Sequence, residues 1–413
     1  MISERAAGRW ILVLIGGAAV VRIAAGLPRG EERLLRDGYE FYTTISGNFL
    51  DGRGLCYSSE GGCAARLPLY PLWLAPFIAS GTLYPGVIIA QAALGAMLAW
   101  IVAELGALLF DRRAGLVAAA AAAFNPYAVI HDTSLQDTVF INVLIPLALL
   151  LLLRARAGGS TAMWVGAGAA LALAILTNAR IALFMPSALV WVLAAGGRDW
   201  ASRVRAGAIV MLPVVVLVGG WMVRNWRVVG APVLTTEAGE RLWFANNPRT
   251  FAHFPERSID LTADELIQIV PAETRARLES FGGTEPQRDA LVRGWALDYM
   301  QEDPLRTALG GMRKIWVAAS AQLSPARGPI LQAGYAIVFV PIHILAIWTL
   351  LRTRANRAEH NLTWLLLLSF VVTTAAFWAH TSHKSYLDAV LFVYAAAAVT
   401  AWFPARTAAA VAA

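Results

Sequence analysis

Charged residues are scarce in this chain of 413 residues: they make up 15% of it, whereas hydrophobic residues make up 58%. A soluble domain of this size could not hide so much apolar surface from water. The composition therefore excludes an ordinary soluble enzyme or binding module. It predicts a polytopic membrane protein.

Lysine is nearly absent, since Lys314 and Lys384 are the only two. The formal net charge of +7 thus comes almost wholly from arginine. In a membrane protein such a basic balance is typical of cytoplasmic loops that face anionic lipid. We therefore expect membrane lipids as partners, and no nucleic acid.

The first apolar segment, residues 10–27, lacks a small-residue cleavage site at its end, and a charged loop follows it directly. We interpret it as a retained anchor and not as a secretory signal. Tandem repeats and low-complexity linkers are also lacking, which predicts a single domain over residues 1–413.

Apolar runs of membrane-spanning length recur along the whole chain. We expect an all-α protein with about ten transmembrane helices. They are placed at residues 10–27, 84–110, 114–131, 138–153, 161–177, 180–196, 206–223, 328–351, 361–379 and 387–403.

Arginines concentrate in alternate short connections, which are the cytoplasmic ones by the positive-inside rule. Both termini are then cytoplasmic. The two large connections, residues 28–83 and 224–327, are then extracytoplasmic.

Both large loops contain amphipathic stretches that are typical of interfacial helices. The segment "RLPLYPLWLAPFI" predicts one such helix, broken by Pro68, Pro71 and Pro76. Residues 285–320 predict two helices that meet near Asp303 and Pro304, the second lying along the membrane.

Cys56 and Cys63 are the only cysteines, and both lie in the first large loop. That compartment permits oxidation, and the short glycine-containing segment between the two cysteines can close. We predict a disulfide, the alternative being two unpaired thiols.

Ionisable groups gather at the outer ends of the expected spans. Such groups are functional candidates because burying them unpaired is costly. The group comprises Asp37 beside Tyr39 and Tyr42, then His131, Asp132, Asp137, Arg180, Arg224, Glu240, Arg241, His380, His383, Lys384 and Asp388. A reaction centre is therefore expected on the extracytoplasmic side.

Four stretches resemble a known family. They are "RDGYEFYTTISGNFLDGRGL" followed by "ARLPLYPLWLAPF", "SLQDTVFINVLIPLALLLL", "GWMVRNWRVVGAPVLTTEAGERLWFANNP" and "HTSHKSYLDAVLFVYAAAA". In these stretches the chain is similar to GT-C glycosyltransferases, the group of protein mannosyltransferases and bacterial lipid A aminoarabinose transferases. Asp137 stands where the family more usually has Glu, Lys384 where Arg is common, and Asp388 where Pro is common.

The resemblance implies a polyprenyl-phosphate-linked sugar as donor and inverting transfer at the extracytoplasmic face of a bacterial inner membrane. The acceptor would be a lipid, a glycan or a protein of the cell envelope. Inverting transfer needs a base to deprotonate the acceptor, for which Asp37 is our first candidate and Asp137 our second.

The leaving phosphate needs fixed cations, each contributing roughly 2–4 kcal/mol by analogy with oxyanion donors. Lys384 is the leading candidate, with Arg180, Arg224 and Arg241 as further ones. The expected substrate pocket comprises Tyr39, Tyr42, Arg66, Tyr70, Asp132, Glu240, Asn247, His380, His383 and Tyr386.

Each assignment has a structural alternative. Asp37 could be a solvated loop acid, and Asp137 a helix cap. Lys384 could pair with Asp388 at i,i+4, and Arg224 could only snorkel at a span end.

His131, His380 and His383 suit a divalent cation, but a three-residue spacing is weak evidence for one, and no cofactor is firmly predicted. Two other functions stay open. One is an O-antigen ligase-like transferase, against which the acid of the first loop argues. The other is a transporter or flippase, against which the lack of inverted halves argues.

Overall fold

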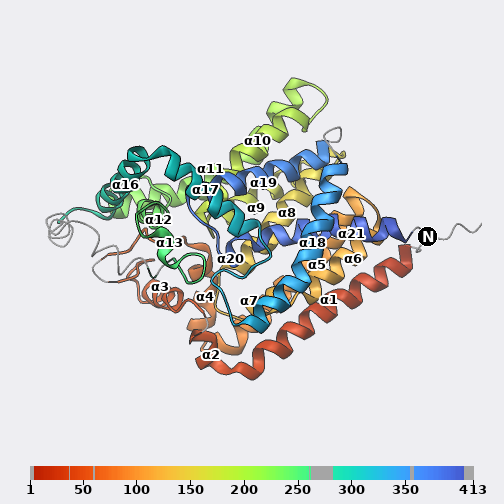
Figure 1. Cartoon of the computed structure of the whole chain (residues 1–413), viewed down its shortest axis with the longest axis horizontal. Coiled ribbons are helices and arrows are strands. Elements are labelled where there is room, and N and C mark those ends of the chain that lie inside the picture. The colour runs from red at the N-terminus through yellow and green to blue at the C-terminus, as the bar shows by residue number, and fades with distance from the viewer. Residues whose placement is uncertain are drawn as a thin grey trace, which may run out of the picture.

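The computed structural model describes residues 4–36, 38–58, 61–259, 261, 282–353 and 358–403. Over these ranges the chain is helical, with one isolated β-bridge and no strand. The all-α fold class predicted from the sequence is confirmed. Figure 1 shows the long helices arranged as a bundle, with further helices gathered at one end of it.

The helices of the first half are α1 (Glu4–Gly26), α2 (Gly30–Arg36), α3 (Phe41–Leu50), α4 (Leu69–Ala79), α5 (Leu83–Leu109), α6 (Arg112–Phe124), α7 (Pro126–Asp132), α8 (Thr138–Arg156), α9 (Thr161–Ile175) and α10 (Phe184–Ala195), with short 3₁₀ turns η1 (Leu27–Arg29) and η2 (Ala179–Leu183). Those of the second half are α11 (Trp200–Val229), α12 (Ala238–Ala245), α13 (Thr250–His253), α16 (Glu285–Glu302), α17 (Pro304–Ala319), α18 (Pro329–Arg352), α19 (Ala358–Ala376), α20 (Thr381–Lys384) and α21 (Asp388–Trp402), with η3 (Ser385–Leu387).

The bundle is built around α5, which packs against α1, α6 and α8, while α9 bridges α8 and α11. Small residues allow close approach, as in many membrane helix pairs. A Cβ added to Gly106 of α5 would lie 2.6 Å from the Cα of Gly115 in α6. The Ala-rich sequence of α6 therefore serves packing.

Every predicted span coincides with a helix, but the number of crossings is not confirmed. In the part of the chain that the structure describes, six helices are long and apolar enough to cross a membrane, or up to seven if the bent pair α6 and α7 forms one span. The helices α9 and α10 are shorter apolar helices. The bend of 51° occurs at Asn125, whose side chain caps α7, with Pro126 at the first helical position.

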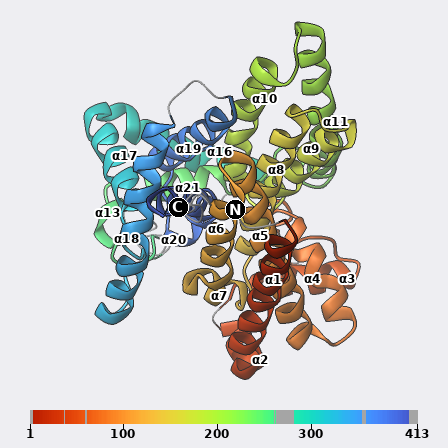
Figure 2. The same cartoon turned by 90° about the vertical axis from the view of Figure 1, so that its right-hand side faces the viewer.

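The helices of the large loops lie at one end of the bundle, and the N-terminus lies at the other (Figure 1). Seen from that second end, the two labelled termini face the viewer (Figure 2). A hydrogen bond of 2.7 Å from Arg113 to the carbonyl of Phe403 ties the end of the described C-terminal segment to the start of α6. The described chain thus begins, at α1, and ends, at α21, away from the helices of the second large loop.

The predicted break of α4 by three prolines is wrong. Pro68 is the N-cap, Pro71 falls in the first turn, and Pro76 lies inside a helix that continues to Ala79. Proline is tolerated in a first turn because the N–H it lacks has no intrahelical acceptor there.

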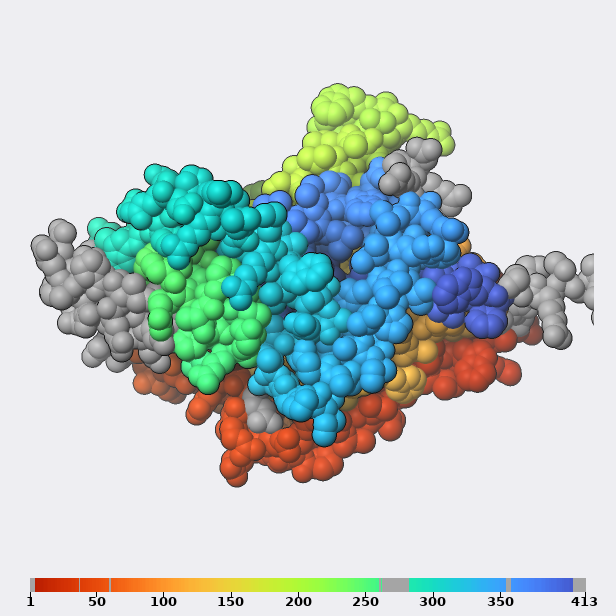
Figure 3. Space-filling model, viewed as in Figure 1, coloured from red at the N-terminus to blue at the C-terminus, as the bar shows by residue number. Residues whose placement is uncertain are grey.

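The second large loop, predicted from residue 224, includes the end of α11, which continues to Val229 and ends at Gly230 in a left-handed conformation with φ 82°. The predicted break between its two long helices is confirmed: α16 ends at Glu302, and the Asp303 side chain caps α17. In Figure 3 the green and cyan segments of this loop, α12, α13, α16 and α17, cover one end of the molecule.

Candidate active site

The turn between α7 and α8 carries Asp137, one of the two predicted catalytic carboxylates. The Gln91 side chain of α5 donates to the backbone carbonyls of Asp132 (2.8 Å) and Ser134 (2.9 Å) in this turn. The Tyr70 hydroxyl of α4 donates to the Gln91 amide oxygen at 2.9 Å. The turn is thus held by the bundle and by the first large loop together, and Gln91 is a residue that the sequence analysis missed.

The first loop docks on the same turn. The N–H of Tyr39 donates to the carbonyl of Leu135 at 2.9 Å. A Cβ added to Gly38 would lie 2.4 Å from the Cβ of Leu135, so only glycine allows this approach. Asp37, the other predicted carboxylate, directly precedes this contact but lies outside the described residues.

Asp137 is 9% exposed, and burial raises the pKa of its carboxyl to about 6. Hydrogen bonding with Tyr42 and the positive charge of Arg66 oppose that rise. Burial and the neighbouring carboxylate keep the pKa of Tyr42 and Tyr70 well above their ordinary value, so both phenols are neutral. Asp137 therefore lies among neutral hydroxyls, and the positive charges of Arg66 and Arg180 favour its ionised form.

A carboxylate that the sequence analysis missed links two predicted arginines. Glu237 pairs with Arg66 at 2.8 Å and with Arg241 at 2.9 Å. Arg66 also lies over the Phe41 ring, 4.3 Å from its centroid. The signal was present in the i,i+4 spacing of Glu237 and Arg241, which is the spacing of helical ion pairs. The predicted Glu240 lies on α12 but is exposed.

Arg180 borders a small cavity between η2, α8, α19 and the segment after it. The guanidinium lies 5.2 Å from the Trp378 ring centroid. Its Nη1 and the indole Nε1 of Trp378 are buried without a hydrogen-bond partner among the described residues. The polar residues lining this cavity are Asn178, Arg180, Thr373, Thr374, Trp378, His383 and Tyr386.

Unused buried donors are costly and rare in folded proteins. Two of them border one cavity, where acceptor oxygens would satisfy both. Arg241 and Asp137 are close enough to influence the Arg180 charge, so this cavity, which we call the Arg180 cavity, and the Asp137 turn belong to one electrostatic neighbourhood.

Lys384, predicted to lead phosphate binding, has its ammonium at the C-terminal end of α17. It donates to the carbonyls of Ala318 (2.8 Å) and Ser320 (2.9 Å). A cation at a helix C-terminus is favourably placed for the helix dipole. This placement supports a structural role, with two of its three donors already engaged.

Both late histidines have hydrogen-bond partners within the protein. The His380 ring is 3.1 Å from the Ser324 hydroxyl, and the His383 ring accepts from the backbone N–H of His380 at 3.2 Å. His131 instead bonds to the Gln136 amide at 2.7 Å. Over the described ranges no three or more His, Cys, Asp or Glu side chains are grouped so that they could hold a metal ion.

Asp132 forms a buried ion pair with Arg22 of α1 at 2.7 Å. A Cβ added to Gly95 would lie 2.0 Å from the Arg22 Nε, so this glycine makes the room for the arginine. Asn247 uses its side chain to bond to backbone groups of its own turn, at Trp243 and Phe244.

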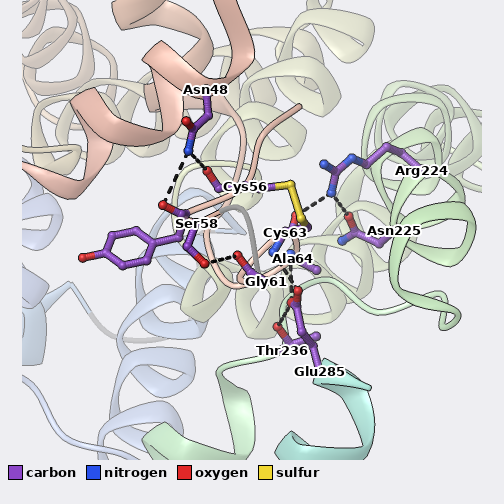
Figure 4. Close-up of a disulfide and its surroundings, with 11 residues drawn as sticks. Asn48, Cys56, Ser58, Gly61, Cys63, Ala64, Arg224, Asn225, Thr236 and Glu285 are labelled. Atoms are coloured by element: carbon purple, nitrogen blue, oxygen red, sulfur yellow. Dashed lines mark hydrogen bonds between the residues drawn. A yellow bond between two sulfur atoms is a disulfide. The ribbon is translucent and has the colours of Figure 1, made fainter. Parts of the chain in front are cut away.

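The predicted disulfide between Cys56 and Cys63 is present. Figure 4 shows its surroundings. Arg224, predicted as a phosphate ligand or a snorkelling residue, donates to the carbonyl of Cys63 and lies over the Trp221 ring at 4.8 Å. It thereby joins α11 to the disulfide loop.

Residues 67–221 match the family model of dolichyl-phosphate-mannose-protein mannosyltransferases. This segment contains Tyr70, Asp137 and Arg180. No curated protein matches the chain in a sequence comparison.

Solved structures of the oligosaccharyltransferase of Archaeoglobus fulgidus resemble the whole chain. The apo form matches with a TM-score of 0.57 at 14% identity, and covers 95% of this chain and 50% of its own. The same enzyme in complex with an inhibitory peptide and a dolichol-phosphate matches with a TM-score of 0.51 at 16% identity, with the same coverage. The chain thus spans about half the length of these relatives. The shared architecture confirms the resemblance found in the sequence: the chain is a polytopic membrane protein with the GT-C glycosyltransferase fold.

Proposed function

We propose that the protein is an inverting glycosyltransferase that uses a polyprenyl-phosphate-linked sugar as donor. Its acceptor is a lipid, a glycan or a protein of the cell envelope. The observation that carries the proposal is the buried carboxyl of Asp137, which hydrogen-bonds with Tyr42 and lies in one electrostatic neighbourhood with Arg66, Arg180 and Arg241. The family match over this region and a structural relative solved with dolichol-phosphate support it.

In this reaction the acceptor oxygen forms a bond to the anomeric carbon, and the bond from that carbon to the phosphate oxygen breaks. The proton of the acceptor passes to a carboxylate, and the polyprenyl phosphate leaves with the bonding electrons. A general base is most effective when its pKa lies near the working pH. Asp137, with a pKa of about 6, meets this condition. We retain Asp37, which precedes the segment docked on the Asp137 turn, as the other candidate base.

The leaving phosphate gains charge in the transition state, so fixed donors that already point at its oxygens accelerate its departure. We assign this role first to Arg180 and Trp378, whose buried Nη1 and Nε1 lack a partner among the described residues. Arg241 supports them. Lys384 moves from first to last among our candidates because its ammonium already serves two carbonyls.

We place the site at the extracytoplasmic face of a bacterial inner membrane, with both termini in the cytoplasm. This orientation is supported by the arginine-rich short connections and by the large loops at the end opposite to the N-terminus. The end of the molecule with the large loops carries Asp137 together with Arg66, Arg180 and Arg241. This grouping suits a transfer reaction, so a transporter is not favoured as the alternative function.

The test uses the full chain, purified and reconstituted in vesicles with a polyprenyl-phosphate-sugar donor and a cell-envelope lipid extract as acceptor. Asp137→Asn is expected to lower kcat about 10²–10⁴-fold, the range of general-base catalysis. Asp298→Asn, an exposed carboxylate on α16, is the matched control and is expected to retain turnover. Asp37→Asn tests the second base in the same assay.

Two results would overturn the proposal. One is full turnover by the Asp137→Asn variant and also by the Asp37→Asn variant, each measured as a single substitution. The other is a complete lack of donor cleavage with every lipid-linked sugar while a substrate crosses the vesicle membrane, which would favour a transporter.

A further inference from the structure

One carboxylate of the second large loop reaches the disulfide loop of the first. Glu285, the first residue of α16, accepts the backbone N–H groups of Cys63 at 2.8 Å and Ala64 at 3.2 Å. It also accepts the hydroxyl of Thr236 at 3.0 Å. Figure 4 shows these bonds converging on the carboxylate beside the disulfide. Glu285 is therefore bonded to three separate donors from two distant segments.

The same two segments are also joined directly. The N–H of Thr236 donates to the carbonyl of Ala64 at 3.0 Å, and the Thr235 hydroxyl donates to that of Ala65 at 2.8 Å. We call residues 63–65 and 235–236, which pair in this way, the loop seam. Arg224 contacts the first residue of the loop seam, because its side chain donates to the Cys63 carbonyl.

The loop seam directly precedes, in both of its segments, a residue of the candidate active site. Arg66 is the next residue on one side and Glu237 the next on the other, and these two pair at 2.8 Å. Glu237 in turn holds Arg241 at 2.9 Å. A backbone that is fixed at one residue restricts the position of the next. The loop seam therefore restricts the positions of Arg66 and Glu237, and through Glu237 that of Arg241.

We infer that Glu285 is a positioning residue of the transfer reaction, which binds the disulfide loop to the second large loop and so fixes Arg66, the ion-pair partner of Glu237, near Asp137. This inference rests on the proposed function. Among the described residues, the hydrogen bonds of Glu285 go to Cys63, Ala64 and Thr236 and not to Asp137, so it acts through the loop seam.

A carboxylate is the side chain that this place requires. It offers acceptor oxygens only, and charge-assisted bonds to backbone N–H groups are about twice as strong as neutral ones. A glutamine would keep one acceptor oxygen and turn an NH₂ group toward donors that cannot receive it. The seam should therefore loosen in the Glu285→Gln variant without a change in side-chain volume.

The experiment compares Glu285→Gln with Glu302→Gln, an exposed glutamate at the other end of the same helix. Hydrogen exchange of the segment around residues 61–65 reads the seam directly. Loss of the carboxylate bonds is expected to speed exchange there by about tenfold or more in Glu285→Gln only. The control should exchange like the wild type.

Transfer kinetics read the positioning role. Because Arg66 lowers the pKa of Asp137, a displaced Arg66 is expected to move the acid limb of the pH profile of kcat/KM to higher pH, and to lower kcat/KM at its plateau. A Thr236→Val variant, which removes one donor and keeps the carboxylate, is expected to change both readouts in the same direction and less. It also keeps the test open if Glu285→Gln does not fold.

Unchanged exchange in both variants overturns the inference. Faster exchange with an unchanged pH profile and unchanged kcat/KM overturns it too, because Glu285 would then be a structural residue only. A wild-type protein inert toward every lipid-linked sugar refutes the proposed function instead, and hydrogen exchange alone then decides whether Glu285 holds the seam.

Discussion

Replacing Asp137 with asparagine is expected to lower the rate of transfer about 10²–10⁴-fold and, at the same time, to stabilise the protein above pH 6. Burial raises the pKa of this carboxyl from 3.8 to about 6, so ionising it costs free energy in the folded state. The shift of about 2 units corresponds to roughly 3 kcal/mol. Asparagine keeps the shape and an acceptor for Tyr42 but removes the charge.

The effect has a defined pH window. Below about pH 4 the carboxyl is protonated in both the folded and the unfolded state, so its buried form carries no penalty. Between pH 4 and 6 the unfolded state releases the proton while the folded state keeps it, and the wild type loses stability as the pH rises. Above pH 6 both states are ionised and the penalty stays constant.

The measurement is the Tm of wild type and Asp137→Asn in the same detergent from pH 4 to 8. The variant is expected to gain on the wild type across pH 4 to 6 and to hold a constant lead above it. Asp298→Asn, at an exposed site, should show no such gain. A variant that melts below the wild type at pH 8 would refute the assignment of Asp137 as a carboxylate destabilised by burial.

Three further predictions concern the rest of the molecule. Arg22→Ala leaves Asp132 as a buried uncompensated charge and is expected to cost about 3–5 kcal/mol, seen as a lower Tm and poor membrane yield; an unchanged Tm would contradict the buried pair. Arg180→Gln is expected to lower kcat about 10²–10³-fold with the fold intact, measured by donor turnover, and wild-type turnover would remove Arg180 from the phosphate site. Serine at both Cys56 and Cys63 opens a short loop and is expected to cost about 2–3 kcal/mol by the chain-entropy estimate, which thermal unfolding with and without reductant can measure.

The helices were predictable because each long apolar run must satisfy its backbone inside the membrane, which only a helix does for a single segment. Residues 138–153 and 328–351, for example, coincide with α8 and α18. The number of helices that cross the membrane was less predictable, because α9 and the segment of α10 are apolar but shorter than the helices that meet the length for a span. Hydropathy records an apolar environment and does not say how much of the bilayer a helix traverses.

The site was only partly predictable for a related reason. Asp137 and Arg180 stand out as charges at the ends of apolar runs, where burial is costly. Glu237 and Gln91 do not, because their roles arise from partners distant in sequence: Arg66 for the first and the turn at Asp132 and Ser134 for the second. The carbonyl partners of Lys384 were not predictable either, because the helix end that receives its ammonium is distant in sequence.

The pair of Arg22 and Asp132 also constrains how the protein is made. The two residues are 110 positions apart, so α1 enters the membrane long before its counter-ion has been synthesised. On insertion scales an arginine within a span costs up to about 3 kcal/mol. We therefore expect that α1 packs stably only after α5, which carries Gly95, and the bent pair α6 and α7, which carries Asp132, have also been inserted. Only then is the charge neutralised, so docking of the first helix becomes a late step in biogenesis.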